Sequence, residues 1–183
     1  METVKRIDPA DAMGKTRELF AAAAERLGVV PNMLRVMGHS PELLGAYLDL
    51  NRAIHGLAVP ERLRILIAAA VAEATGCDYG VSFSRGFAMR AGLPDEDFDS
   101  ACRAEARDPR TDAALRFVAK SVENRGHLPA SEVEALRQAG FGEREIVEII
   151  GLVGVNLWRN YFNLLAGTPV ESATGWAAAV AAG

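Results

Sequence analysis

Cys77 is the residue of this sequence with the clearest capacity for covalent chemistry. It follows Gly76 and precedes a stretch with helical spacing of apolar residues, so we expect its thiol at a helix N-terminus. Backbone N–H groups and the helix dipole favour a thiolate there, whereas the neighbouring carboxylate of Asp78 opposes one. Cys77 is therefore a candidate nucleophile, and the alternative is a packed, unreactive thiol.

Two further side chains could serve this thiol. Glu73 lies one helical turn before Cys77 and is the acid close enough in sequence to move a proton for it. Ser84 supplies a hydroxyl on the following helix, and Cys102 could resolve an oxidised Cys77. We predict Cys77, Glu73 and Ser84 as candidate catalytic residues. The alternative is that Glu73 reaches water at a helix end and Ser84 fills space.

Metal and cofactor motifs are missing from the sequence. The three histidines, His39, His55 and His127, stand far apart and have no HxxxH or CxxC spacing around them. No GxxxxGK occurs, and no GxGxxG follows a strand pattern. We therefore predict no metal site and no cofactor.

Composition limits the class of protein. With 183 residues, 50% of them apolar, the sequence predicts one domain over residues 1–183 that folds on its own. A net charge of −4 disfavours nucleic acid as a partner, and the longest apolar runs are too short for a membrane span. Two cysteines make no disulfide framework, and residues 1–10 carry no secretory signal pattern, so we expect a cytoplasmic location.

The elements that position these residues are all expected to be helices. Apolar residues recur at helical spacing almost throughout, and Gly and Pro separate the periodic stretches. The stretch 65–72 is apolar on every face, which predicts a central helix. The predicted helices cover residues 11–27, 32–38, 41–54, 60–75, 77–91, 94–104, 111–124, 129–139 and 143–165.

The last of these helices is unusually apolar. Its aromatic residues Trp158 and Tyr161 have the spacing of a core or a subunit interface. Together with the Ala-rich residues 175–183, this helix exceeds what one small core requires, which predicts self-association. The residues expected to pack inward are Ile146, Ile149, Ile150, Val153, Leu157 and Phe162.

Several segments resemble one known family. They are 71–84 (VAEATGCDYGVSFS) with 91–93 (AGL), 28–34 (GVVPNML) with 40–44 (SPELL), and Phe162-Asn163 with Thr168-Pro169. They are similar to the carboxymuconolactone decarboxylase and alkylhydroperoxidase D-like (AhpD-like) superfamily. The resemblance implies an all-α, AhpD-like multi-helix bundle. It also implies a homo-oligomer, a trimer or hexamer, with its pocket near a subunit boundary.

The same resemblance implies a dithiol site that this sequence has mostly lost. Active members carry a glutamate, eleven residues, a CxxC pair, three residues and a histidine. The corresponding positions here are Ile65, Cys77, Gly80 and Ser84. Substituting Ile65→Glu, Gly80→Cys and Ser84→His together tests whether only these groups separate this chain from its redox-active relatives.

Three functions remain open. The reading that fits the missing groups best is a catalytically divergent or silent, oligomeric member of the family. The second is a thiol-dependent peroxidase that uses Cys77 alone, with Glu73 assisting proton transfer and Cys102 or an external thiol regenerating it. The third is a lactone or keto-acid decarboxylase, which needs no dithiol. Either enzyme would act on a small-molecule substrate.

Overall fold

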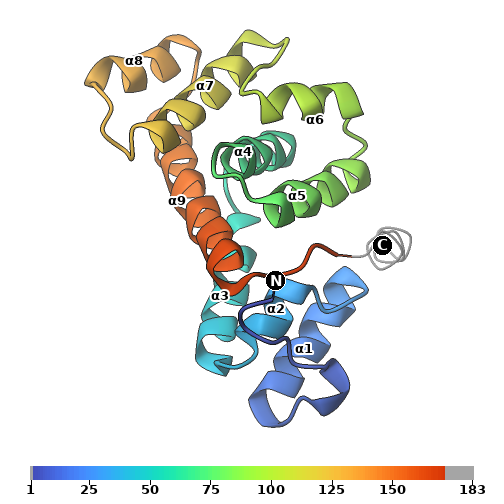
Figure 1. Ribbon diagram of the computed structural model, residues 1–183. Helices are drawn as coiled ribbons and strands as arrows, with labels where there is room; N and C mark the ends of the chain where they lie inside the picture. Colours follow the sequence, from blue (N-terminus) through green and yellow to red (C-terminus); the bar gives the residue numbers. More distant parts are fainter. Residues whose placement is uncertain (1, 172–183) are drawn as a thin grey trace. The chain divides into compact units, whose positions relative to one another are not determined.

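The computed structural model describes residues 2–171 (Figure 1). These residues form helices joined by short loops and contain no strand, which confirms the all-α prediction. Helix boundaries differ from the predicted ones by a few residues, and a short 3-10 turn was not expected. The elements are η1 (Pro9–Asp11), α1 (Gly14–Leu27), α2 (Asn32–Met37), α3 (Pro41–Ile54), α4 (Glu61–Ala74), α5 (Asp78–Arg90), α6 (Asp95–Cys102), α7 (Pro109–Glu123), α8 (Ala130–Gln138) and α9 (Glu143–Ala166).

Contacts divide the described chain into two compact units. Unit 1 takes its residues from Met1–Gly56 and Asn163–Gly183, and unit 2 is Leu57–Phe162. In unit 1, α3 packs against both α1 and α2. The predicted single domain over residues 1–183 stays a prediction, and the predicted Ala-rich segment 175–183 lies outside the described residues.

Unit 2 is built around α4. This helix packs against α5, α6 and α7, and Figure 1 shows these three around it. The central position expected from its apolar sequence is therefore confirmed. Its buried side chains are Leu63, Ile65, Leu66, Ile67, Ala69, Ala70, Val71 and Ala72.

A three-residue connection joins α4 to α5. Gly76 has a φ of +65°, a left-handed backbone conformation that favours glycine. The turn is closed by the N–H of Cys77, which donates to the carbonyl of Ala72 at 2.9 Å. Cys77 is thereby held at the start of α5, as the sequence predicts.

Polar contacts hold the first half of α9 within unit 2. Arg110 of α7 donates to Glu145 of α9 at 2.6 Å. Glu148 accepts the backbone N–H of Val59, before α4, at 2.9 Å, and also binds Arg144. These interactions set which side of α9 packs inward.

One prediction for α9 is wrong. Ile146, Ile149 and Val153 are buried as expected, but Ile150 is 49% exposed. Consecutive helical residues point about 100° apart. With Ile149 fully buried, the next residue therefore turns away from the core.

Candidate functional site

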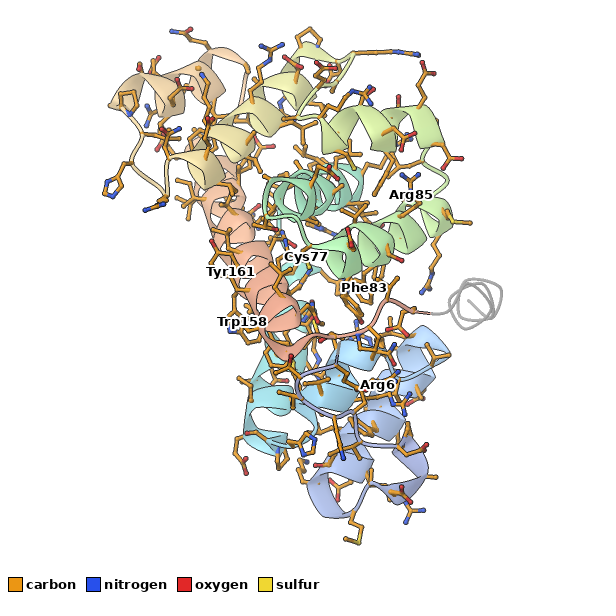
Figure 2. All side chains as sticks on the ribbon, in the orientation of Figure 1. Arg6, Cys77, Phe83, Arg85, Trp158 and Tyr161 are labelled. Carbon is orange, nitrogen blue, oxygen red and sulfur yellow. The ribbon has the colours of Figure 1, made fainter. Side chains whose placement is uncertain are left out.

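Cys77 is the N-cap of α5, and Figure 2 shows it at the start of that helix. Its side chain is almost completely buried, with 1% of the residue exposed. The sulfur accepts the backbone N–H of Gly80 at 3.4 Å, and the N–H of Tyr79 also interacts with it. The Cys77 sulfur therefore acts as the N-cap acceptor of α5.

Burial raises the pKa of the Cys77 thiol, and the neighbouring carboxylate of Asp78 raises it further. The N–H groups of Gly80 and Tyr79 act in the opposite direction, but the net shift is upward. At neutral pH the group is a neutral thiol. A reactive cysteine needs the reverse, a lowered pKa with access to solvent.

Gly80 stands at the position where the second sulfur of a CxxC pair would be. A Cβ built on Gly80 would overlap with the Oδ1 atom of Asn160 and would lie 2.9 Å from the Cβ of Ala72. Real Cβ atoms essentially never approach a neighbour so closely. The space of the second sulfur is therefore filled by a side chain from α9.

A hydrogen bond holds Asn160 in this place. Its Nδ2 donates to the hydroxyl oxygen of Thr75 at 3.1 Å. The Thr75 hydroxyl in turn lies 2.8 Å from the carbonyl oxygen of Val71 and 3.0 Å from that of Ala72. Asn160 is 3% exposed, so its amide gains little from water. Thr75, at the end of α4, thus holds the amide of Asn160 in the orientation that leaves no room for a side chain at Gly80.

The other two motif positions are packed into the interior of unit 2. Ile65 lies in α4 and is 8% exposed, in the place where active members carry glutamate. Ser84 lies on α5, one turn after Gly80, and is also buried. Neither position supplies a charged group next to the Cys77 thiol.

Glu73 acts on the other cysteine. Its side chain is exposed near the end of α4. Burial raises the pKa of the Cys102 thiol, and the Glu73 carboxylate raises it further. The groups that shift the pKa of Cys77, besides its burial, are Gly80, Asp78 and Tyr79. The role of Glu73 in moving a proton for Cys77 stays a prediction.

The two cysteines are both free and have different surroundings. Cys102 ends α6 and is half-buried. After burial and Glu73, its pKa responds to Arg85, Asp99 and Arg103. Of the predicted residues, Cys77 caps α5 and Ser84 lies on that helix, whereas Glu73 lies on α4 and Cys102 at the end of α6.

Sequence reasoning missed Asn160 and Thr75. A signal for the first was present, because Asn156, Asn160 and Asn163 recur at helical spacing and all three are buried. A polar side chain on the buried face of an apolar helix needs a partner inside the protein. That partner could not be read from the sequence.

Residues 2–171 contain no group of three or more His, Cys, Asp or Glu side chains placed to hold a metal ion. Within the same residues, no helix has both the length and the apolar character of a membrane span.

A family comparison matches part of the chain. Residues 41–123 fit the model of the carboxymuconolactone decarboxylase family. This region contains Ile65, Cys77, Gly80 and Ser84. A search of curated proteins finds no match.

Several solved structures have a similar fold. The alkylhydroperoxidase AhpD core protein of Ralstonia eutropha JMP134, an uncharacterized peroxidase-related protein, matches with a TM-score of 0.82 and 20% identity, over 93% of this chain and 92% of that one. An uncharacterized peroxidase-related protein of Silicibacter sp. TM1040 matches with a TM-score of 0.81 and 25% identity, over 93% of each chain.

The debrominase Bmp8 has the same fold. Its cysteine-to-alanine variant in complex with 2,3,4-tribromopyrrole matches with a TM-score of 0.78 and 23% identity, over 97% of this chain and 96% of that one. These similarities confirm the predicted AhpD-like fold.

Proposed function

Because the chain belongs to the carboxymuconolactone decarboxylase and AhpD-like superfamily, we propose that it is a catalytically divergent, self-associating member that does not run the dithiol peroxidase cycle. The observation that carries this proposal is the position of Asn160. Its side chain fills the space that a second sulfur at Gly80 would need. Cys77 then has a structural role, as the buried acceptor that caps α5.

The electrostatics of Cys77 support the same conclusion. A dithiol cycle begins when a thiolate attacks a peroxide and becomes a sulfenic acid, which the second thiol then reduces by forming a disulfide. The first step needs an ionised, accessible sulfur, and Cys77 is buried with a raised pKa. The second step needs a neighbouring thiol, and Gly80 has none.

One observation favours a second candidate, a peroxidase that uses Cys77 alone. The sulfur faces the N–H groups of Tyr79 and Gly80 at the start of a helix, where a thiolate is stabilised. In that reaction the thiolate attacks one peroxide oxygen, the O–O bond breaks, and the leaving oxygen takes a proton to give an alcohol or water. An external thiol would then reduce the sulfenic acid in two steps, releasing water and a disulfide.

Peroxide treatment separates the two candidates. The folded wild-type protein receives stoichiometric hydrogen peroxide with dimedone, which traps sulfenic acids, and the modified peptide is identified by mass spectrometry. We expect no adduct at Cys77 until the protein is unfolded in urea. The matched variants are Cys77→Ser and Cys102→Ser. Peroxide turnover with an added thiol that is lost in Cys77→Ser but survives in Cys102→Ser would overturn the proposal and establish a one-cysteine peroxidase.

A brominated pyrrole extends the same test to another substrate class. The fold neighbour Bmp8 is a debrominase, so 2,3,4-tribromopyrrole is a reasonable probe of thiol chemistry on this fold. We expect no bromide release by the wild-type protein with excess dithiothreitol as reductant. Release that depends on Cys77 would replace the silent reading with reductive debromination.

A further inference from the structure

One side of α9 is exposed and carries no charge. From Val147 onward, the charged residues of this helix are Glu148 and Arg159, and neither is among its exposed positions. Glu148 is instead bound by Val59 and Arg144. The exposed positions are Val147, Ile150, Gly151, Gly154, Trp158, Tyr161, Leu164 and Leu165.

Six of these positions form a continuous stripe, which we call the α9 face: Val147, Ile150, Gly151, Gly154, Trp158 and Tyr161. At 100° per residue they fall within an arc of about 100° and extend over roughly 21 Å of helix. Figure 2 shows Trp158 and Tyr161 on the side of α9 away from α4 and α5. The opposite side of α9 is buried in unit 2, where Ile149 and Leu152 pack beside Asn156 and Asn160. A contiguous apolar stripe on the outer side of such a helix marks an interaction surface.

The middle of the α9 face is open to close approach. A Cβ built on Gly151 or on Gly154 would have no atom within 4 Å. Larger side chains stand on either side of these glycines, with Val147 66%, Ile150 49%, Trp158 36% and Tyr161 54% exposed. The face is therefore a shallow depression with an aliphatic end and an aromatic end.

The order of residues makes this face complementary to itself. Ile150 and Trp158 lie four residues on either side of Gly154, and Val147 and Tyr161 lie seven residues on either side. If two such helices run antiparallel with their glycines opposed, each aromatic side chain meets an aliphatic one. We propose that the α9 face binds the same face of a second copy of this chain, in a two-fold antiparallel contact centred on Gly154.

The available area suits such a contact. A standard interface buries about 800 Å² on each partner, of which roughly three fifths is apolar. The four large side chains of the α9 face, between 36% and 66% exposed, contribute apolar area toward that total. The paired glycines let the two backbones approach, as small residues do in tightly packed helix pairs.

This inference rests on the self-association in the proposed function and assigns the surface responsible for it. A two-fold contact is part of a dimer, or of a hexamer built from dimers, but a closed trimer lacks one. Of the two oligomers that the resemblance implies, the geometry therefore favours the hexamer. Cys77 takes no part in the contact. A dimedone adduct at Cys77 would therefore overturn the silent thiol without affecting the α9 face, and an unchanged mass of Ile150→Glu would overturn the α9 contact without affecting Cys77.

The first experiment measures mass by light scattering at micromolar concentration. We expect a dimer or hexamer for the wild-type protein and half that mass for Ile150→Glu, because a charge placed on the α9 face cannot be buried unpaired. The control is Met89→Glu, which changes an exposed apolar residue of α5 that is 58% exposed and should keep the wild-type mass. A wild-type monomer or trimer, or a mass unchanged by Ile150→Glu, would overturn the proposal.

A second experiment fixes the geometry, in a Cys102→Ser background under mild oxidation. Gly154→Cys should give a disulfide-linked dimer, because the two-fold axis brings these positions together, within the Cα separation of about 7 Å that a disulfide allows. Val147→Cys and Tyr161→Cys should each stay unlinked alone and form a linked dimer when mixed. Linkage by Val147→Cys alone would mean another arrangement and would refute the two-fold contact.

Removal of residues 172–183 tests for a different occupant of the α9 face. Residues 172–183 of the same chain include Trp176 and a run of alanines. If the wild-type protein is a monomer that associates only after these residues are removed, the α9 face belongs to that segment, and the proposal is wrong.

Discussion

The side-chain amide of Asn160 occupies the space beside Gly80 in which any side chain at that position would have to lie. Its Oδ1 atom overlaps with a Cβ built on Gly80, and its Cγ atom lies 3.3 Å from that Cβ. Because Thr75 binds the other end of the amide, Asn160 cannot turn away without losing a buried hydrogen bond. Asn160 of α9, held by Thr75, therefore occupies the space that a second sulfur at Gly80 would need.

Gly80→Ala should destabilise the protein, although alanine normally stabilises a helix interior. Crowding of a packed interior costs about 1–3 kcal/mol, which exceeds the gain of roughly 0.5–1 kcal/mol from helix propensity. The free energy of unfolding in urea measures the balance. The control is Gly45→Ala in α3, where the nearest atom to the new Cβ is Leu19 Cδ1 at 4.0 Å, so stability should hold or rise. In an Asn160→Ala background, Gly80→Ala should destabilise less, because only the close contact with the Ala72 Cβ remains, and an unchanged penalty would refute the role of Asn160.

Restoring the dithiol site should require four substitutions. Ile65→Glu, Gly80→Cys and Ser84→His return the groups of the active family members but leave Asn160 in the place of the new sulfur. We expect the three together to show no disulfide to Cys77 and no peroxidase activity. Adding Asn160→Ala should permit the disulfide, as measured by a thiol count with and without reductant. A disulfide already present with three substitutions would show that Asn160 moves aside at little cost.

Thr75→Val should be more harmful than Thr75→Ser. Valine keeps the shape of threonine but leaves the buried Nδ2 of Asn160 without its acceptor, at a cost of about 1–3 kcal/mol. Serine keeps the hydroxyl and loses one methyl group. Thermal and urea unfolding of the two variants compare these effects directly. Equal stability of the two would mean that the hydrogen bond contributes nothing.

Alkaline pH should weaken the protein partly through Cys77. Burial raises the pKa of this thiol in the folded state above its unfolded value. The resulting stabilisation is complete below the unfolded pKa and is lost as the pH rises through the folded pKa. The free energy of unfolding should therefore fall less steeply with alkaline pH in Cys77→Ala than in the wild type. Cys102→Ala should reduce the slope further in the double variant, because its pKa is also raised. If the free energy of unfolding fell equally steeply with pH in the wild type and in the cysteine variants, the raised pKa values of the two thiols would be contradicted.

Acidification should remove the contribution of Glu148. Burial raises the pKa of this carboxyl, but the N–H groups of Ala58 and Val59 and the guanidinium of Arg144 outweigh it, and the net shift is downward. The stabilisation is present above the unfolded pKa and disappears as the pH falls through the folded pKa. Glu148→Gln should lose about 1–3 kcal/mol at neutral pH, and the difference from the wild type should shrink in acid.

The control for Glu148 is Glu143→Gln. That carboxylate also has a lowered pKa, through Arg137, but its side chain is 72% exposed and water screens the pair. Its substitution should change stability little at any pH. A larger loss from Glu143→Gln than from Glu148→Gln would contradict the assignment of Glu148 as the buried link between α9 and the start of α4.

The sequence by itself determined the helices and the place of Cys77 among them. Helix boundaries depend on hydrogen bonds between residues a few positions apart, such as the Ser40 side chain accepting the N–H of Leu43, and on Gly76 in the turn before α5. The changes at Ile65, Gly80 and Ser84 are likewise visible residue by residue. These features need no knowledge of distant contacts, so sequence reasoning reaches them.

Tertiary structure alone decided what surrounds each of these residues. Asn160 meets Thr75 across 85 positions of sequence, and the Glu73 carboxylate raises the pKa of the distant Cys102 thiol. Ile150 turns outward although its type suits a core. Helical periodicity shows which residues share a face but not which neighbour, if any, covers it. The filled space at Gly80 and the exposed α9 face both follow from how helices pack, which depends on contacts between distant parts of the chain.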